Sequence, residues 1–534
     1  MMYSPQDIIA RVGQLQGERS TFLSHWEELR RYLVPNQEVQ NKRQPGAKNH
    51  GEIYENSGII SLSLLAGFIH GLLTNPNQVW FELSTGDDDL DSEAEVREWL
   101  QDSDKRIIAM LNNTNFQTQI HPYYLNLCGF GTAVLSMEED EDYIMRFGAR
   151  RLKECCVVEN NKGQIDEIYR TFEMNSKQLV QEFGEENVIE KVLKYFKEGK
   201  PDKFEVTQCV YPNLEKQGPF PYLSKYILHE EAKVLREKGY WEFPFAVSRW
   251  EVEAGEVYGR SPGMAALPEI KTVNKISEQM LIAGAKNCDP PLQMPDDGFV
   301  MPARTKPGGQ SYYRAGSTDR IEPIYKDIKL DWSIELLNQR NERIRQTFYS
   351  DQLQMRQGGP QKTAAEVYQI AEEQMRLLGP MLGRQNHESG EPIISRAFGV
   401  MLRAGKLKPV PRILAQSDQM QSRRGKLDVR YTSMIAIAQR AAEGQNITRT
   451  LGAVAPLGEI DPSVWDIFNL DQTAKTLAKI NGYPQKAMNS DDAVEERRQA
   501  RQEAQQAQLD EQQQMMQAEQ QVKQAQTAKA LQAV

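Results

Sequence analysis

The sequence predicts an α+β fold that is mainly α-helical, and three observations support this prediction. Residues 268–287 and 331–349 carry apolar residues at three- and four-residue spacing, which is the pattern of amphipathic helices. Between residues 79 and 250, short apolar runs bounded by Gly, Pro and acidic residues predict strands that alternate with helices. From residue 363 to residue 480 the pattern is mainly helical again.

The amino-terminal part is predicted to be helical. Ser4-Pro5 is a helix start, Gly17 marks a break between two helices, and Pro35 ends the pair. A polar loop then leads to an apolar run over residues 59–73, which is shorter than the roughly 18 residues that a membrane-spanning helix needs. Gly67 and Gly71 also interrupt this run, so we expect a buried helix.

The middle of the chain is predicted to be mixed α/β. The acidic run that starts at Asp87 favours a helix amino terminus, and the Gly129-Phe130-Gly131 break separates a helix from a strand. The five acidic residues at 138–142 are interpreted as the solvated tip of a hairpin. One helix is expected over residues 176–198, and strands are expected at 79–83, 143–147, 165–172, 204–210, 222–229 and 245–250.

Residues 258–366 form the segment around which we expect the chain to be organised. A helix that begins near Ser261-Pro262 or Leu267-Pro268 is followed by a Pro- and Gly-rich insert, and a second helix opens at Asp331 or Ser333. The next stretch, residues 351–362, contains Gly-Gly-Pro and cannot continue a helix. A new helix follows, because Thr363 and Glu366 form a capping box. The loop could act as a gate or clamp, or could be a plain surface connection.

The carboxyl-terminal part contains a predicted helix through residues 393–401, a strand at 427–432, and helices around 435–454, 464–468 and 472–480. From Asp491 onward the chain is rich in Gln, Ala, Glu and Arg, with few large apolar residues. Such a composition cannot bury an apolar face, so residues 491–534 are predicted to be disordered or loosely helical.

Composition narrows the range of functions. The chain has 534 residues and a formal net charge of −10. Tight binding to nucleic acid relies on Lys and Arg that neutralise phosphates, so an acidic chain is not expected to hold DNA firmly. The five cysteines lack paired CxxC spacing and are interpreted as buried or incidental thiols, with neither a disulfide framework nor a zinc site.

Enzyme motifs are incomplete in this sequence. Gly259-Arg260-Ser261-Pro262-Gly263 matches the G-x-S-x-G pattern of hydrolases, but Pro262 lacks the amide that would help form the oxyanion hole. We therefore interpret Ser261 as a helix cap. His229-Glu230-Glu231-Ala232-Lys233 has Lys where H-E-x-x-H requires a second zinc ligand. The acidic clusters near Asp87 and Glu138 leave a metal-dependent nuclease formally open.

Several stretches together resemble the portal, or head-to-tail connector, proteins of T7-like short-tailed bacteriophages. The resemblance is spread over most of the chain and is carried by the stretches 65–76, 80–83, 115–135, 258–271 and 363–367. It implies a portal fold in which residues 1–260 form an α/β wing that residues 363–430 complete. It further implies stem helices at 261–288 and 331–350, a clip at 289–330, a tunnel loop at 351–362 and a helical crown at 431–490.

The same resemblance implies a structural function: a homo-oligomeric ring, expected to be a dodecamer, at the portal vertex of the virion. Double-stranded DNA would pass weakly and non-specifically through its channel during packaging and ejection. Expected partners are the terminase large subunit, the major capsid and scaffolding proteins, a tail adaptor, and internal core or ejection proteins. No catalytic residue, metal, cofactor or direct membrane binding is expected, and the subunits would assemble in the host cytoplasm.

Two groups of residues are the predicted channel contacts. On the stem helices they are Lys275, Arg340, Arg343 and Arg345. Around the tunnel loop they are Gln352, Gln354, Met355, Arg356 and Lys362. The alternatives that remain are a metal-dependent DNA-processing enzyme, and a membrane-active ejection protein that would expose residues 59–73.

Overall fold

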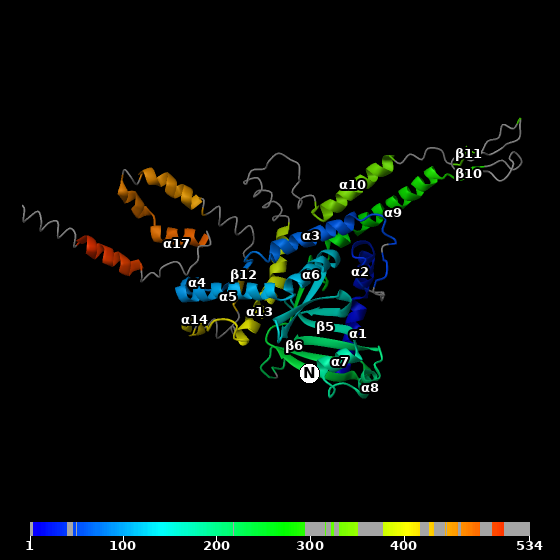
Figure 1. Ribbon diagram of the computed structural model, residues 1–534, viewed down its shortest axis with the longest axis horizontal. Coiled ribbons are helices and arrows are strands. Elements are labelled where there is room, and N and C mark those ends of the chain that lie inside the picture. The colour runs from blue at the N-terminus through cyan, green and yellow to red at the C-terminus, as the bar shows by residue number, and fades with distance from the viewer. Residues whose placement is uncertain are drawn as a thin grey trace, which may run out of the picture. The chain divides into compact units, whose positions relative to one another are not determined.

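The computed structural model shows a mixed α and β protein (Figure 1). It describes residues 4–39, 46–49, 51–216, 218–293, 316, 322–324, 331–350, 378–416, 427–431, 444, 446–457, 461–480 and 494–506. The described chain divides into two compact units. The first comprises Met1–Ser84, Ser103–Pro409 and Asp418–Ile435, and the second comprises Thr85–Asp102, Val410–Ser417 and Ala436–Val534.

A five-stranded antiparallel sheet forms the centre of the first unit. Its strand order is β4 (Cys155–Glu159), β5 (Ile165–Asn175), β6 (Lys203–Pro212), β7 (Tyr222–Leu228) and β8 (Lys233–Tyr240). Successive residues of a strand point to opposite faces, so Val206 and Leu228 pack on one face while Cys209 and Ile227 pack on the other. Helices α7 (Ser176–Phe183) and α8 (Glu190–Glu198) cover the first face, and α1 (Pro5–Glu18) covers the second.

A smaller antiparallel sheet adjoins the helices of the first unit. Its order is β3 (Ile144–Arg150), β2 (Thr132–Asp140) and β9 (Phe245–Arg249). Helix α6 (Phe116–Phe130) packs against it, and the Tyr123 hydroxyl lies within hydrogen-bond distance of the Ser248 hydroxyl. A further short pair joins β1 (Phe81–Ser84) to β12 (Asp428–Tyr431).

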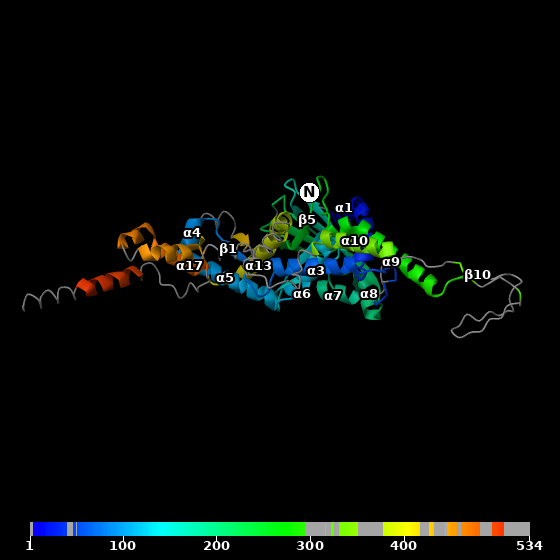
Figure 2. The same ribbon diagram turned by 90° about the horizontal axis from the view of Figure 1, so that it is seen from above.

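Five further helices lie wholly within the described part of the first unit. They are α2 (Ser20–Leu33), α3 (Ser57–Leu73), α9 (Pro262–Cys288), α10 (Asp331–Thr347) and α13 (Glu391–Arg403), with a π-helical turn, η3 (Asn386–Gly390), before α13. Three of them, α2, α3 and α9, pack on α6. Figures 1 and 2 both show α9 and α10 side by side. Trp26 of α2 is fully buried and donates its indole N–H to the Phe130 carbonyl oxygen at 3.1 Å.

Other short elements complete the described chain. Helix α5 (Ala94–Asn113) follows α4 (Asp88–Ser92), and the two-residue strands β10 (Leu292–Gln293) and β11 (Glu322–Pro323) pair with each other. The first unit also contains the 3₁₀ turns η1 (Leu152–Glu154) and η2 (Glu230–Ala232). In the second unit lie α14 (Arg412–Gln416), the 3₁₀ turn η4 (Pro462–Ile467) and α17 (Leu470–Ile480), together with helical residues at 446–457 and 494–506.

The predicted helix starts are largely confirmed. The Ser4 side chain and Asp7 form a reciprocal capping box at α1, and α9 begins at Pro262 with Ser261 as its cap. Pro268 therefore lies inside α9 and does not start it. The single helix expected over residues 176–198 is wrong. Gly184, with φ of +83°, ends α7, because a left-handed backbone cannot continue a right-handed helix.

Two strands of the larger sheet were not predicted, and the acidic hairpin differs from expectation. Strand β4 is a short edge strand, and β8 carries several charges in place of an apolar alternation. The hairpin exists, but Glu138 and Glu139 lie within β2 and not at its tip. The Glu138 carboxylate accepts a hydrogen bond from the Tyr240 hydroxyl at 2.9 Å, so the solvated-tip interpretation is wrong for this residue.

Candidate functional site

The base of α9 is held by close backbone contacts with the end of α6. The Ser261 hydroxyl accepts a hydrogen bond from the Met264 amide at 3.0 Å and donates one to the Gly129 carbonyl oxygen at 2.8 Å. Gly131 has φ of +82°, and a Cβ at this position would lie 2.3 Å from the Gly259 carbonyl oxygen. The glycines of both motifs therefore allow close chain approach, and Ser261 is confirmed as a helix cap.

Helix α9 changes from buried to exposed along its length. Its first half packs into the first unit through Ala266, Leu267, Ile270 and Val273, all of which are buried. From Lys275 to Cys288 no residue of α9 is buried, and Leu281 is 62% exposed. This half of the helix therefore lies outside the packed interior of the first unit.

Helix α10 lies along α9 and is tied to it near the base. Both carboxylate oxygens of Glu269 accept hydrogen bonds from the Arg340 guanidinium, at 2.7 and 2.8 Å. Arg343 lies 3.5 Å from the same carboxylate. Because these side chains are partly exposed, the ion pairs contribute no more than about 1 kcal/mol each. Burial of Ile344 and Phe348 fixes the carboxyl-terminal end of α10 more firmly.

The four predicted stem cations do not form one cluster. Arg340 is turned toward Glu269, so its charge supports the helix pair. Lys275 bonds to Glu278 of its own helix at 2.7 Å, and this bond raises the pKa of the lysine. Arg345 is exposed and forms no ion pair with any residue in the described part of the chain. The loop residues Gln352, Gln354, Met355, Arg356 and Lys362 lie outside the described residues.

Two buried arginines were not predicted from the sequence. Arg249, which is 3% exposed, ends β9 and binds Glu388 of the π-helical turn at 2.8 Å and Glu159 of β4 at 2.9 Å. Arg396 is fully buried on α13 and donates to the Met137 carbonyl oxygen at 2.8 Å. Arg396 lies three residues after Ile393, on the apolar face of a predicted helix, and a charge in that position was the available signal.

The acidic residues show no metal centre in the described part of the chain. There, no group of three or more His, Cys, Asp or Glu side chains could hold a metal ion. Glu139, which belongs to the acidic run of the hairpin, lies 3.5 Å from Arg403 and 3.8 Å from Arg396. This carboxylate therefore belongs to ion pairs that join the hairpin to α13. Among the described helices, none is both long enough and apolar enough to cross a membrane.

Sequence comparison identifies relatives over nearly the full chain. Residues 5–488 match the family described as bacteriophage head to tail connecting protein. The probable portal protein of Bordetella phage BPP-1 is 30% identical over 492 residues, which are 89% of this chain and 87% of that protein. The portal protein of Salmonella phage epsilon15 is 26% identical over 515 residues, which are 92% of this chain and 90% of that protein.

Solved structures with a partial likeness come from gene transfer agent (GTA) particles. The neck of an empty GTA particle is 10% identical, with a TM-score of 0.37, over 79% of this chain and 94% of that chain. A chain of the native GTA virion is 12% identical, with a TM-score of 0.32, over 64% of this chain and 85% of that chain. The family assignment rests on the sequence matches: this chain belongs to the bacteriophage head to tail connecting protein family.

Proposed function

We propose that copies of this chain form a ring at one vertex of a phage capsid, with α9 and α10 beside a central channel for double-stranded DNA. Family membership and the α9–α10 pair support this proposal. The pair is rooted in the first unit, while its far half exposes Leu281, Ile282, Trp332 and Ile334. Exposed apolar side chains of this size suit contacts with neighbouring copies of the same pair. The expected ring is a dodecamer.

The proposed ring is a structural component of the virion and not an enzyme. The segment 289–330, between the far ends of α9 and α10, would dock the terminase large subunit during packaging and a tail adaptor afterwards. The remainder of the chain would contact the major capsid and scaffolding proteins and any internal core or ejection proteins. Assembly would take place in the host cytoplasm. No cofactor or metal takes part in this function.

Weak electrostatic contact with DNA is part of the proposal. Each additional phosphate neutralised by Lys or Arg steepens the salt dependence and raises the affinity, so a strongly basic bore would arrest a moving duplex. Here the net charge is −10, Lys275 is paired with Glu278, and Arg340 is paired with Glu269. Arg343 and Arg345 remain the more exposed cations of α10, which would centre the duplex without holding it.

The loop 351–362 would act as the gate that retains packaged DNA. Deletion of residues 354–359 should leave rings intact but impair packaging or release the packaged genome, measured as the fraction of particles with nuclease-resistant DNA. A variant in which Gly and Ser replace the same residues controls for chain length and should reproduce the defect if side chains contact the duplex. Normal DNA retention by the deletion variant would contradict the gating role.

A further inference from the structure

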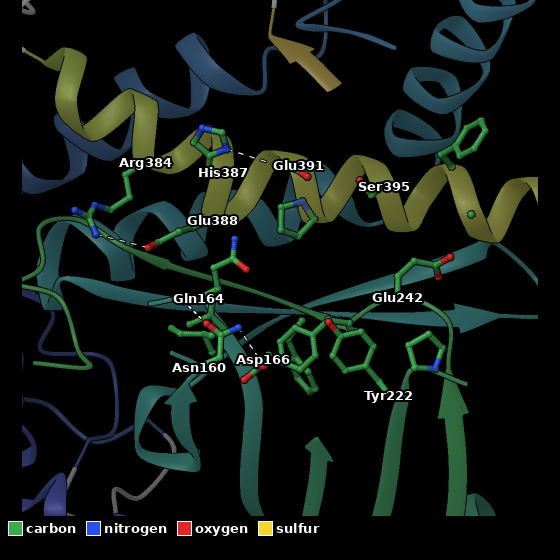
Figure 3. Close-up of a pocket in the computed structure, with 18 of the residues that line it drawn as sticks. Asn160, Gln164, Asp166, Tyr222, Glu242, Arg384, His387, Glu388, Glu391 and Ser395 are labelled. Atoms are coloured by element: carbon green, nitrogen blue, oxygen red, sulfur yellow. Dashed lines mark hydrogen bonds and ion pairs between the residues drawn. The ribbon is translucent and has the colours of Figure 1, made fainter. Parts of the chain in front are cut away.

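A cleft of about 1020 Å³ lies in the first unit, and none of its lining residues belongs to α9 or α10. Figure 3 shows η3 and α13 along one wall, where Glu388, Glu391 and Ser395 are labelled. Asp166 of β5 and Tyr222 of β7 are labelled on the opposite wall. The channel function assigns no role to this space, although its volume is near the upper end of the range for small-molecule sites.

Three aromatic side chains that line the cleft are only partly buried. They are Tyr222, Trp241 and Phe243. The ring centroids of Tyr222 and Phe243 are 5.4 Å apart, so these two rings form one continuous surface. Trp241 is 40% exposed, and its ring packs edge-on against Phe220. Aromatic rings contact aliphatic chains and attract cations through the negative charge of their faces. This part of the cleft therefore suits a ligand with an aliphatic chain and a positive charge.

Asp166 provides a carboxylate on the same wall (Figure 3). It is only partly buried, it accepts a hydrogen bond from the neutral Asn160 amide at 3.2 Å, and it has no ion pair within the described ranges. Burial raises the pKa of the Tyr222 hydroxyl, and the negative charge of Asp166 raises it further. The carboxylate therefore lies near the Tyr222 ring, and both can contact the same small ligand.

Most of the other charges along the cleft are compensated within the protein. Glu388 binds Arg249 at 2.8 Å, and Glu242 binds Arg403 at 2.6 Å. The lining contains four carboxylates and three guanidinium groups, which belong to Asp166, Glu242, Glu388, Glu391, Arg249, Arg384 and Arg403. With His387 neutral, the lining carries one negative charge in excess, so a ligand with a positive charge would complement it.

We propose that this cleft binds a small organic cation that carries a primary ammonium group on an aliphatic chain. The ammonium group would donate hydrogen bonds to Asp166, which can accept more than the one bond from Asn160. The aliphatic chain would lie on the rings of Tyr222 and Phe243, where its methylene groups are removed from water. A hydrogen bond between two charged groups is stronger than a neutral one, so Asp166 would select the cation. The proposal does not depend on the ring or on DNA.

The probe is dansylcadaverine, in which an alkyl chain joins a fluorescent group to a primary ammonium group. Its binding to the full chain is measured by fluorescence anisotropy, and saturable binding is expected. The N-acetylated form of the probe has the same chain and fluorescent group but no charge. It should bind about tenfold more weakly or worse, because it cannot form a charge-assisted hydrogen bond to Asp166.

Competition with unlabelled compounds shows which source of the ammonium group the cleft prefers. Putrescine represents a free amine, and Nα-acetyl-lysine N-methylamide represents the lysine side chain of a protein. The compound that displaces the probe at the lower concentration identifies the preferred source. Pentan-1-ol has an aliphatic chain without a charge, and it should not displace the probe at these concentrations.

Two pairs of variants locate the binding site. Asp166→Asn keeps an acceptor oxygen for Asn160 but removes the charge, and it should weaken binding about tenfold. Asp142→Asn, on the exposed hairpin turn, is the matched control and should bind as the parent does. Tyr222→Leu removes the ring and should weaken binding about threefold, whereas Tyr222→Phe keeps the ring and should bind nearly as the parent does. The N-acetylated probe tests the charge on the unaltered protein, whether or not a variant folds.

Four results would overturn the proposal. The first is the absence of saturable binding, and the second is equal binding of the N-acetylated probe. The third is unchanged binding to Asp166→Asn, which would place the probe elsewhere on the protein. The fourth is binding that appears only after Arg423, Arg424 and Lys426 are replaced by Gln. That result would assign the cleft to the chain's own basic segment, which directly precedes the lining residue Leu427.

Discussion

At the residue scale, buried charges define the interior of the first unit. Arg249 lies where β9 ends and the chain turns toward α9, and it joins β4, the β4–β5 turn and the π-helical turn. It also donates to the Val257 carbonyl oxygen at 3.3 Å, only a few residues before the cap of α9. This one guanidinium therefore connects the segment that follows residue 377 to the root of the helix pair.

Replacement of Arg249 by Met should lower the stability of the first unit strongly. Glu388 would keep the backbone amide of residue 249, but its nearest cation would be the more distant Arg384, 3.7 Å away, and breaking a buried pair costs about 3–5 kcal/mol. Because Glu388 and Glu159 are partly exposed, the lower end of this range is expected. The urea concentration at the midpoint of unfolding measures this loss of stability. Arg345→Met on the exposed face of α10 is the control, and it should change stability by about 0.5 kcal/mol or less. Equal midpoints for the two variants would contradict the role of Arg249.

Asp104 gives a pH-dependent prediction. Burial raises its pKa well above the ordinary value, although the hydrogen bond from the Leu83 amide, at 3.0 Å, opposes this shift. A carboxyl group with a raised folded-state pKa favours folding below its unfolded-state pKa, near 4, and this contribution is lost as pH rises through the folded-state value. Asp104→Asn keeps the acceptor oxygen for Leu83 without the charge.

The melting temperature of Asp104→Asn should therefore exceed that of the parent protein at pH 8. The difference should shrink as the pH falls toward about 4, where the parent carboxyl group is protonated in both states. Asp142→Asn, on the exposed hairpin turn, is the matched control and should change the melting temperature little at either pH. A lower melting temperature for Asp104→Asn at pH 8 would show that the charged carboxylate is stabilising.

At the scale of elements, local sequence signals predicted where several helices begin, whereas a strand without an apolar pattern was not predicted. Ser4, Ser261 and the break near Gly17 were sufficient to locate α1, α2 and the start of α9, because capping acts over a few residues. Strand β8 could not be recognised, since only Leu235 and Tyr240 of its residues are buried. It pairs with the preceding strand, β7, across the η2 turn, and this backbone pairing does not require the apolar alternation by which a strand is recognised in a sequence.

The candidate site could be predicted only in part. The two helices of the pair follow from their apolar spacing, but the partner of Arg340 does not, because Glu269 is far away in the sequence. The contact between the two glycine motifs could not be predicted for the same reason. Gly131 and Gly259 were recognised as motif residues, while their mutual backbone contact appears only in three dimensions.

Gly131→Ala tests this contact between α6 and the root of α9. The added Cβ would meet the Gly259 carbonyl oxygen at 2.3 Å, and φ of +82° disfavours any other residue. We expect a loss of about 2 kcal/mol or more, seen as a lower melting temperature. Gly67→Ala on α3 is the control, because nothing lies within 4 Å of its Cβ, and it should stabilise by up to about 1 kcal/mol. Equal effects of the two changes would contradict the close approach.

At the scale of the whole molecule, family membership and charge point to the same function. The proposed connector would let a long anion slide, and a chain with a net charge of −10 has no overall attraction for phosphates. The far half of the α9–α10 pair exposes Leu281, Ile282, Trp332 and Ile334, which neighbouring copies in the proposed ring would cover. Assembly is therefore the property from which the other proposed roles follow.

Negative-stain electron microscopy of the purified full-length chain tests assembly most directly. The predicted result is rings with a central hole wide enough for a DNA duplex, and with a countable rotational symmetry. Trp332→Glu, which replaces an exposed apolar side chain of α10 with a charge, should shift the population toward single subunits. Compact monomers alone, at concentrations at which assembly is expected, would contradict the proposed portal function.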